Sequence, residues 1–217
     1  MDIERARFNM IESQIRTWEV LDQAVLDTLA EVRREEFVPP QYRSLAFVDM
    51  EIPLGHGEAM LAPKLEARLL QELTLQPADR VLEVGTGSGY QAALLAHRAA
   101  HVYSIELSAD LSASAARKLA RLGIGNVTLR VGNGALGWPE EGPFDAILLT
   151  GSVPVIPPGL REQLADGGRL LAVVGEPPVM TARLVTQISP GVYNETGLFE
   201  TCIAPVREVR QPERFVF

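Results

Sequence analysis

Residues 81–90 read VLEVGTGSGY, a short apolar run that passes directly into a glycine-rich segment. The apolar run is typical of a buried strand, and a helical pattern begins at Tyr90. Gly85, Gly87 and Gly89 let the backbone turn tightly and approach a ligand without a Cβ in the way. The helix that follows points its free N–H groups toward whatever lies in the loop. This stretch therefore predicts a ligand-binding turn between a strand and a helix.

The chain around this stretch alternates between strand and helix patterns. Apolar runs typical of buried parallel strands occur at 81–84, 101–105, 127–131, 146–150 and 170–174. Helical patterns lie between them, at 90–98 and 110–122. The tail, 183–206, alternates as an antiparallel strand pair does. We therefore predict an α/β fold: a doubly wound, mostly parallel seven-stranded sheet with helices on both faces.

The first third of the chain is predicted to be helical. Residues 2–16 and 21–33 carry apolar side chains at helical spacing, and two prolines after Val38 end this region. A loop rich in proline and glycine is expected at 49–63, before an amphipathic helix at 64–73. We expect one domain, 1–217, in which a helical cap with this loop (1–75) packs on an α/β core (76–217).

Composition excludes several classes of protein. A hydrophobic share of 47% is enough to build a core, so the chain is not disordered. The net charge of −8 is opposite in sign to that of most nucleic-acid-binding proteins. One cysteine and three histidines without metal-ligand spacing give no metal site. No apolar run is long enough to cross a membrane, and no signal peptide is visible, so we expect a cytoplasmic protein.

An acidic residue on the next predicted strand indicates the ligand class. Glu106 follows the strand at 101–105, where a carboxylate can accept hydrogen bonds from both hydroxyls of a ribose. The dinucleotide fingerprint would need a third glycine at position 90, which is Tyr90. The spacing is instead E-x-G-x-G-x-G from Glu83, which resembles motif I of class I S-adenosylmethionine-dependent methyltransferases. An acid within an apolar strand needs a partner, and we expect Glu83 to orient the cofactor's amino-acid end, directly or through the loop.

Residues 81–93 are very similar to motif I of the protein-L-isoaspartate O-methyltransferase family. Other segments resemble this family in the same order along the chain. They include MIESQI at 10–15, FVP at 37–39, IPLGHG at 52–57, GNG at 132–134 and PFDAI at 143–147. The resemblance extends over roughly 8–206. It implies a Rossmann-like fold that uses S-adenosylmethionine without a metal and releases S-adenosylhomocysteine.

The same resemblance implies a repair reaction. The family methylates the α-carboxylate of L-isoaspartyl residues in damaged proteins, and the ester then closes to a succinimide that opens partly to normal aspartate. The acceptor carboxylate is already ionised at neutral pH, so the transfer needs no general base. We therefore assign no catalytic residue, because the protein has only to position the reactants and exclude water. The implied partner is a peptide or protein bearing isoaspartate, and the implied state is a monomer.

The resemblance also assigns the binding residues. The cofactor set is Glu83, Gly85, Thr86, Gly87, Gly89, Glu106, Leu107, Asn133, Gly134 and Thr150. Asn133 stands where the family usually has the aspartate that contacts the adenine amino group, and its side chain keeps a carbonyl acceptor. The acceptor loop comprises Pro53, His56, Gly57, Ala59, Met60 and Leu61.

The acceptor loop departs from the family pattern. Where the family has Q-T-I-S-x-P after G-x-G, this chain has EAMLAP at 58–63. Ala59 replaces the threonine and Leu61 the serine, so both hydroxyls are lost. Glu58 replaces a neutral glutamine, and it either repels an anionic acceptor or is a solvated loop charge.

Three functions remain open on these residues. The chain is an active isoaspartyl methyltransferase, a methyltransferase with another acceptor, or a module that binds S-adenosylmethionine or its product without catalysis. The last two are motivated by Ala59 and Leu61. A nicotinamide-dependent dehydrogenase fits poorly, because of Tyr90 and the lack of a placed proton-transfer residue.

Overall fold

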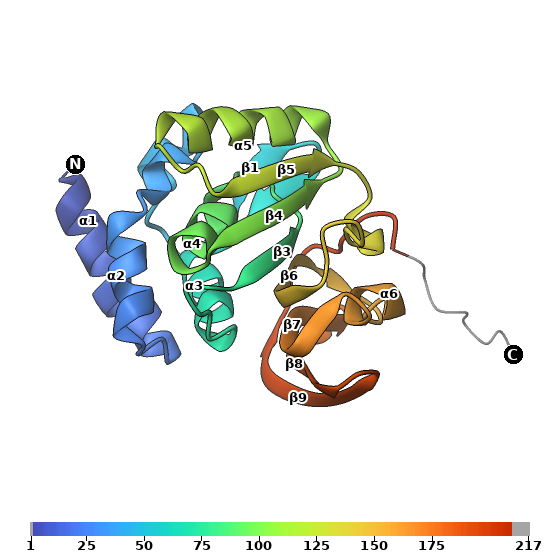
Figure 1. Cartoon of the computed structure of the whole chain (residues 1–217). Helices are drawn as coiled ribbons and strands as arrows, with labels where there is room; N and C mark the ends of the chain where they lie inside the picture. Colours follow the sequence, from blue (N-terminus) through green and yellow to red (C-terminus); the bar gives the residue numbers. More distant parts are fainter. Residues whose placement is uncertain (1, 210–217) are drawn as a thin grey trace, which may run out of the picture.

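The computed structural model describes residues 2–209. The predicted helical first third is confirmed, although the helices are shorter and more broken than the pattern indicated. Helix α1 (Ile3–Met10) continues into a π-helical turn, η1 (Ile11–Ile15), and a 3-10 turn, η2 (Arg16–Trp18). Helix α2 (Gln23–Glu31) is followed by two 3-10 turns, η3 (Arg34–Glu36) and η4 (Pro40–Leu45). Figure 1 shows α1 and α2 in blue, with α2 next to α3 and α4.

The predicted sheet is confirmed in its strand number and mostly parallel arrangement. Its seven strands run in the order β5-β4-β3-β6-β7-β8-β9. They are β3 (Arg80–Val84), β4 (His101–Glu106), β5 (Val127–Val131), β6 (Phe144–Val153), β7 (Leu164–Glu176), β8 (Val179–Ser189) and β9 (Val192–Thr201). The first five pair in parallel, and the last two add as antiparallel strands. The order reverses at β3, which lies between β4 and β6, so a crevice is expected at the carboxyl ends of these strands.

The two faces of the sheet are covered unequally. Helices α3 (Pro63–Glu72), α4 (Tyr90–Arg98) and α5 (Ala109–Arg121) contribute to one buried cluster, with α5 along β4 and β5 (Figure 1). Within residues 2–209, the helical elements on the opposite face are the 3-10 turn η5 (Gly134–Leu136) and the short helix α6 (Pro158–Arg161). Helical turns therefore lie on both faces, as predicted, but those on the second face are much shorter than those on the first. The chain has few residues between β5 and β6 and between β6 and β7, which leaves no room for long helices.

The loop predicted at 49–63 contains a hairpin that the sequence pattern did not indicate. Strands β1 (Ile52–Gly55) and β2 (Glu58–Met60) pair antiparallel, and they are too short to show an alternating pattern. The turn between them places Gly55, His56 and Gly57 at positive φ, which glycine adopts without strain. The hairpin fixes the direction in which the chain continues through residues 58–61 toward α3.

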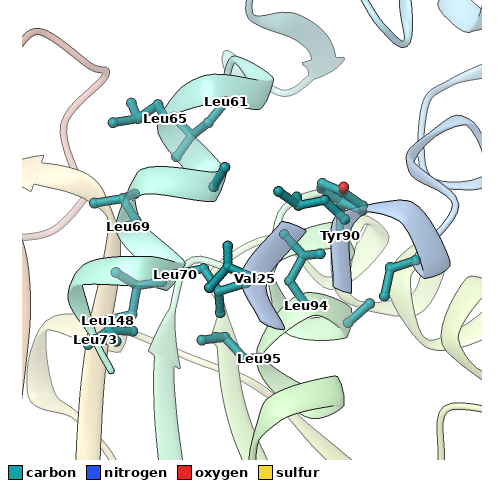
Figure 2. Close-up of a cluster of buried hydrophobic side chains, with 14 of the residues drawn as sticks. Val25, Leu61, Leu65, Leu69, Leu70, Leu73, Tyr90, Leu94, Leu95 and Leu148 are labelled. Atoms are coloured by element: carbon teal, nitrogen blue, oxygen red, sulfur yellow. The ribbon is translucent and has the colours of Figure 1, made fainter. Parts of the chain in front are cut away.

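A buried cluster joins the cap to the α/β core. Figure 2 labels its members Val25, Leu61, Leu65, Leu69, Leu70, Leu73, Tyr90, Leu94, Leu95 and Leu148. They come from α2, α3, α4 and β6 and from the residues that flank α3, namely Leu61 and Leu73, so both parts of the chain bury apolar surface against each other. Burying a leucine side chain stabilises a fold by about 1.5–3 kcal/mol. Leu61, which is 8% exposed, ties the segment before α3 to this core.

Candidate active site

A cavity lies at the crevice that the strand order predicts. Its walls come from the glycine loop after β3, the ends of β4 and β5, and the second half of β6. Residues 58–61 from the hairpin and 204–207 from the C-terminal segment complete it. Residues far apart in the sequence therefore meet at one hollow, as expected for a ligand site in an open α/β sheet.

The glycine loop is held against the neighbouring strand β6. The Thr150 hydroxyl donates to the carbonyl of Gly85 at 2.7 Å. A Cβ on Gly85 would lie 2.3 Å from the Thr150 Oγ1 atom, and the φ of Gly85 is +101°. Glycine is therefore required at 85 both for space and for backbone conformation. Thr150 lines the cavity, and its hydroxyl fixes the loop from the β6 side.

Glu106 holds the same loop from the other side. Its carboxylate accepts hydrogen bonds from the N–H of Gly87 at 2.8 Å and the N–H of Ser108 at 2.9 Å. The residue is only 5% exposed but lines the cavity. Each carboxylate oxygen has a second lone pair, so Glu106 can still accept from a ligand hydroxyl. Leu107 lines the cavity directly after it.

Glu83 lies behind the glycine loop and does not line the cavity. It is fully buried and accepts a hydrogen bond from the Ser104 hydroxyl. Ser104 Oγ is 2.5 Å from Thr86 Oγ1, so the three side chains form a chain beneath the loop. Burial raises the pKa of Glu83 to about 8, against the Ser104 hydrogen bond and with the nearby charge of Glu106. Of the two roles expected for Glu83, the geometry favours support of the loop over direct contact.

Asn133 and Gly134 form the wall at the end of β5. The Asn133 side-chain carbonyl accepts from the N–H of Ala135 at 2.8 Å and caps η5. A Cβ on Gly134 would lie 2.5 Å from Val84 Cγ1, so the backbone passes close to the end of β3. The predicted cofactor residues therefore gather in one place, except that Glu83 and Gly89 lie outside the cavity wall. Gly89 is instead the N-cap of α4, with φ +85°.

The predicted acceptor loop divides into two parts. Ala59, Met60 and Leu61 line the cavity, whereas Pro53, His56 and Gly57 do not. The last two belong to the hairpin turn, where His56 Nε2 lies 3.7 Å from the Asp110 carboxylate on α5. Of the predicted acceptor loop, the segment after the turn is therefore the part that lines the cavity.

A buried ion pair contacts the backbone of the segment 58–61. Arg34 is fully buried and forms an ion pair with Glu66 on α3. Its guanidinium also donates to the carbonyl of Leu61 at 2.7 Å and to that of Ala46 at 2.9 Å. The Arg34 side chain thus connects η3, the segment 58–61 and α3. Its charge is neutralised by Glu66, and its N–H groups donate to backbone carbonyls.

Several residues of the cavity wall were not predicted from the sequence. They include Glu51, Glu66, Ser88, Gln91, Gly151 and Arg207. Arg207 Nε lies 2.7 Å from the Glu58 carboxylate, so Glu58 is an ion-paired charge of the wall. Arg207 follows the end of the segments that resembled the family, and nothing near it in sequence indicated a site. Only the pairing of the C-terminal segment with β6 brings it there.

Residues 2–209 contain neither a membrane-spanning helix nor a metal-binding cluster of side chains. No helix within that range is long and apolar enough to cross a membrane. No group of three or more histidine, cysteine, aspartate or glutamate side chains within it is arranged to hold a metal ion.

The chain is similar over nearly its whole length to known proteins. Residues 5–202 match the family model described as Protein-L-isoaspartate(D-aspartate) O-methyltransferase. Protein-L-isoaspartate O-methyltransferase 2 of Anaeromyxobacter sp. (strain Fw109-5) is 44% identical, over 95% of this chain and 83% of that protein. Protein-L-isoaspartate O-methyltransferase of Methylorubrum populi is 42% identical, over 94% of this chain and 95% of that protein.

A solved structure has the same fold. A Plasmodium falciparum protein described as a protein-L-isoaspartate O-methyltransferase, in complex with S-adenosyl-L-homocysteine, superposes with a TM-score of 0.81. The alignment covers 96% of this chain and all of that chain, at 23% sequence identity. At that identity, the likeness establishes the Rossmann-like architecture.

Proposed function

Because the chain belongs to the protein-L-isoaspartate O-methyltransferase family, we propose that it methylates the α-carboxylate of L-isoaspartyl residues in proteins. The observation that carries the proposal is the single cavity in which the glycine loop meets residues 58–61. A cofactor held by the loop and an acceptor held by the segment would share that space. The reaction is an O-methyl transfer, and its product would enter the repair of damaged aspartate sites.

The residues at the loop fit the implied cofactor. S-adenosylmethionine, when bound, supplies a methyl group on a positively charged sulfur and leaves as neutral S-adenosylhomocysteine. Glu106 would accept from the ribose hydroxyls, and Asn133 would accept from the adenine amino group with its second lone pair. Gly85 would keep the loop close to Thr150 at the amino-acid end, since a Cβ there would collide with the Thr150 hydroxyl. Glu83 would act from behind through Ser104 and Thr86.

The acceptor side needs positioning more than acid–base chemistry. An isoaspartyl α-carboxylate is ionised at neutral pH and attacks as it is, so no residue has to remove a proton. One C–O bond forms, one C–S bond breaks, and the electron pair of the broken bond stays on sulfur. Met60 and Leu61 present apolar surface to the cavity, which excludes water from the reacting groups. The remaining rate enhancement would come from the orientation of the two reactants in a closed site.

The proposal extends to the organisation of the protein. A single domain, with the cap at 1–75 and the core at 76–217, is supported by the buried cluster that joins the two parts. We expect a monomer in the cytoplasm that takes peptide or protein substrates and no nucleic acid. The net charge of −8 supports the last point. Size-exclusion chromatography with light scattering tests the monomer.

A second candidate is a family member that has changed its acceptor or only binds the cofactor. The observation that favours it is the acceptor wall itself, where Ala59 and Leu61 carry no hydroxyl. Glu51, Glu58 and Glu66 lie on the same wall. Glu58 and Glu66 are paired with Arg207 and Arg34, so the acid that would favour a neutral or cationic group over a carboxylate is Glu51.

One experiment separates these candidates. The purified chain is incubated with methyl-labelled S-adenosylmethionine and either an isoaspartyl peptide or a mixture of cellular proteins and metabolites. S-adenosylhomocysteine binding is measured in parallel by calorimetry. A base-labile methyl ester on the isoaspartyl α-carboxylate supports the proposal. Label on another acceptor supports the changed acceptor, and cofactor binding with no labelled product supports the binding module.

A further inference from the structure

Arg207 is the one cationic side chain among the described residues that line the cavity. The other charged members of the wall are glutamates, namely Glu51, Glu58, Glu66 and Glu106. Glu66 is already neutralised by Arg34, and Glu106 accepts two backbone hydrogen bonds. An anionic acceptor that enters this cavity therefore meets one positive charge, on the C-terminal segment.

The backbone that carries Arg207 is fixed against the end of β6. The Ser152 N–H donates to the carbonyl of Ala204 at 2.9 Å, and the Val206 N–H donates to the carbonyl of Ser152 at 2.8 Å. A Cβ on Gly151 would lie 3.0 Å from the Val206 nitrogen, so the two backbones are in close contact. Arg207 is thus presented from a defined position next to Gly151 and Thr150, which also line the cavity.

In this structure, the Glu58 carboxylate forms an ion pair with the guanidinium of Arg207. The ion pair has an N–O distance of 2.7 Å, and its side chains are 44% exposed for Arg207 and 27% for Glu58. Ion pairs with this much solvent contact contribute little stability, so a second carboxylate can replace Glu58 at small cost. Arginine suits that exchange, because its guanidinium keeps its positive charge and has several N–H donors for a carboxylate oxygen.

The neighbouring positions explain why such a cation is needed. Ala59 and Leu61 line the same cavity and offer no side-chain donor to an acceptor carboxylate. A carboxylate that leaves water needs hydrogen bonds or an opposite charge in return. Among the side chains of this wall, Arg207 can provide both.

On the premise of the proposed function, we propose that Arg207 binds the α-carboxylate of the isoaspartyl acceptor and that Glu58 is a built-in competitor for the same guanidinium. Arg207 engages one carboxylate oxygen and leaves the other free to attack the methyl group. The ester formed has lost the negative charge. Glu58 therefore returns to Arg207 after transfer and displaces the product.

The test compares charged and neutral ligands across matched variants of the full chain. The ligands are an isoaspartyl peptide and the same peptide with its α-carboxylate replaced by a carboxamide. Their affinities for the S-adenosylhomocysteine complex are measured by fluorescence anisotropy, with no turnover required. The variants are Arg207→Gln and Glu58→Gln. The control is Arg183→Gln, which removes a similarly exposed arginine that pairs with Glu195 away from the cavity.

The expected pattern is specific to the substrate charge. Arg207→Gln weakens binding of the isoaspartyl peptide about tenfold and that of the carboxamide peptide less than about twofold. Glu58→Gln tightens binding of the isoaspartyl peptide about threefold, and Arg183→Gln changes neither affinity. In turnover, Arg207→Gln raises KM for the isoaspartyl peptide more than it lowers kcat.

Other outcomes overturn the inference. These are equal losses for the two peptides in Arg207→Gln, an unchanged isoaspartyl affinity in that variant, or no measurable binding of either peptide to the wild type. Failure of the proposed function is distinguished by a different result, in which the wild type binds the isoaspartyl peptide through Arg207 but forms no methyl ester. S-adenosylhomocysteine affinity, measured for every variant, verifies that the cofactor side is intact.

Discussion

Arg34 and Glu66 form an ion pair that is almost completely removed from solvent and that contacts the backbone of Leu61, in the segment that lines the cavity. Arg34 comes from the 3-10 turn η3 and Glu66 from α3, and Arg34 also donates to the carbonyl of Leu61. The cavity segment 58–61 is therefore held by a charge pair whose members are 32 residues apart in the sequence.

We expect Arg34→Met to destabilise the fold by about 3–5 kcal/mol, because it leaves the Glu66 charge buried without a partner. Urea unfolding measures the change. The control is Arg130→Met, whose partner Glu140 is 69% exposed, and there the cost should stay below about 1 kcal/mol. Equal costs in the two variants would show that the Arg34 pair contributes no more than a surface contact does.

Gly85→Ala should abolish cofactor binding. The new Cβ would collide with the Thr150 hydroxyl, and the residue would have to keep a φ of +101°. Gly123→Ala is the matched control, because Gly123 also has a positive φ but faces open space. The control should lose about 1 kcal/mol of stability and keep its affinity for S-adenosylhomocysteine. Calorimetric titration decides this, and similar affinities for the two variants would refute the steric account of the loop.

The raised pKa of Glu83 predicts a pH-dependent stability. The native state binds this proton more tightly than the unfolded state, so the stabilisation is complete below about pH 4.5 and is lost as pH rises through about 8. The slope reaches about 1.4 kcal/mol for each pH unit within that window. Glu83→Gln keeps an acceptor for Ser104 but removes the titration.

Unfolding free energies of the wild type and Glu83→Gln should therefore converge or cross as pH rises from 5 to 8. An exposed substitution, Glu140→Gln, is expected to follow the wild type across the same range. Parallel curves for the wild type and Glu83→Gln would mean that Glu83 has no raised pKa in the native protein.

The central strands β3, β4 and β6 could be predicted because they are largely buried on both faces. The prediction that the edge strand β5 is also buried was wrong, because every one of its residues is partly or fully exposed. Residues 81–84 and 101–105 are short apolar runs, and the structure extends them by a single residue each. The hairpin at 52–60 could not be predicted, since strands of four and three residues are too short for a periodic signal. Its stability comes from its turn geometry and from packing on the rest of the chain.

The part of the cavity wall formed by the glycine loop and by the ends of β4 and β5 could largely be predicted, because these residues follow strand ends that carry recognisable motifs. Glu83 and Gly89 were the exceptions: Glu83 lies behind the loop, where it accepts from Ser104 of the neighbouring strand, and Gly89 is the N-cap of α4. Arg207 could not be predicted, because its position depends on hydrogen bonds between the C-terminal segment and β6. The pairing of segments that are distant in the sequence therefore decided the positions of Glu83 and Arg207.

Restoring the two family hydroxyls should reduce the dependence on Arg207. Leu61 is buried in the cluster of Figure 2, so Leu61→Ser will cost about 2–4 kcal/mol of stability. In the Ala59→Thr, Leu61→Ser background, the added donors should bind the acceptor carboxylate, and Arg207→Gln should then raise KM only about threefold. A KM increase as large as in the wild-type background would argue against a shared role.

The most direct test of the account is the rate of methyl transfer to an isoaspartyl peptide beside its normal-aspartate twin. Labelled methyl groups are counted as base-labile esters, at saturating S-adenosylmethionine. We predict that kcat/KM for the isoaspartyl peptide exceeds that for the twin by at least about a hundredfold. Equal rates for the two peptides, or no ester on either by a chain that binds S-adenosylhomocysteine, would contradict the assignment of isoaspartate as the acceptor.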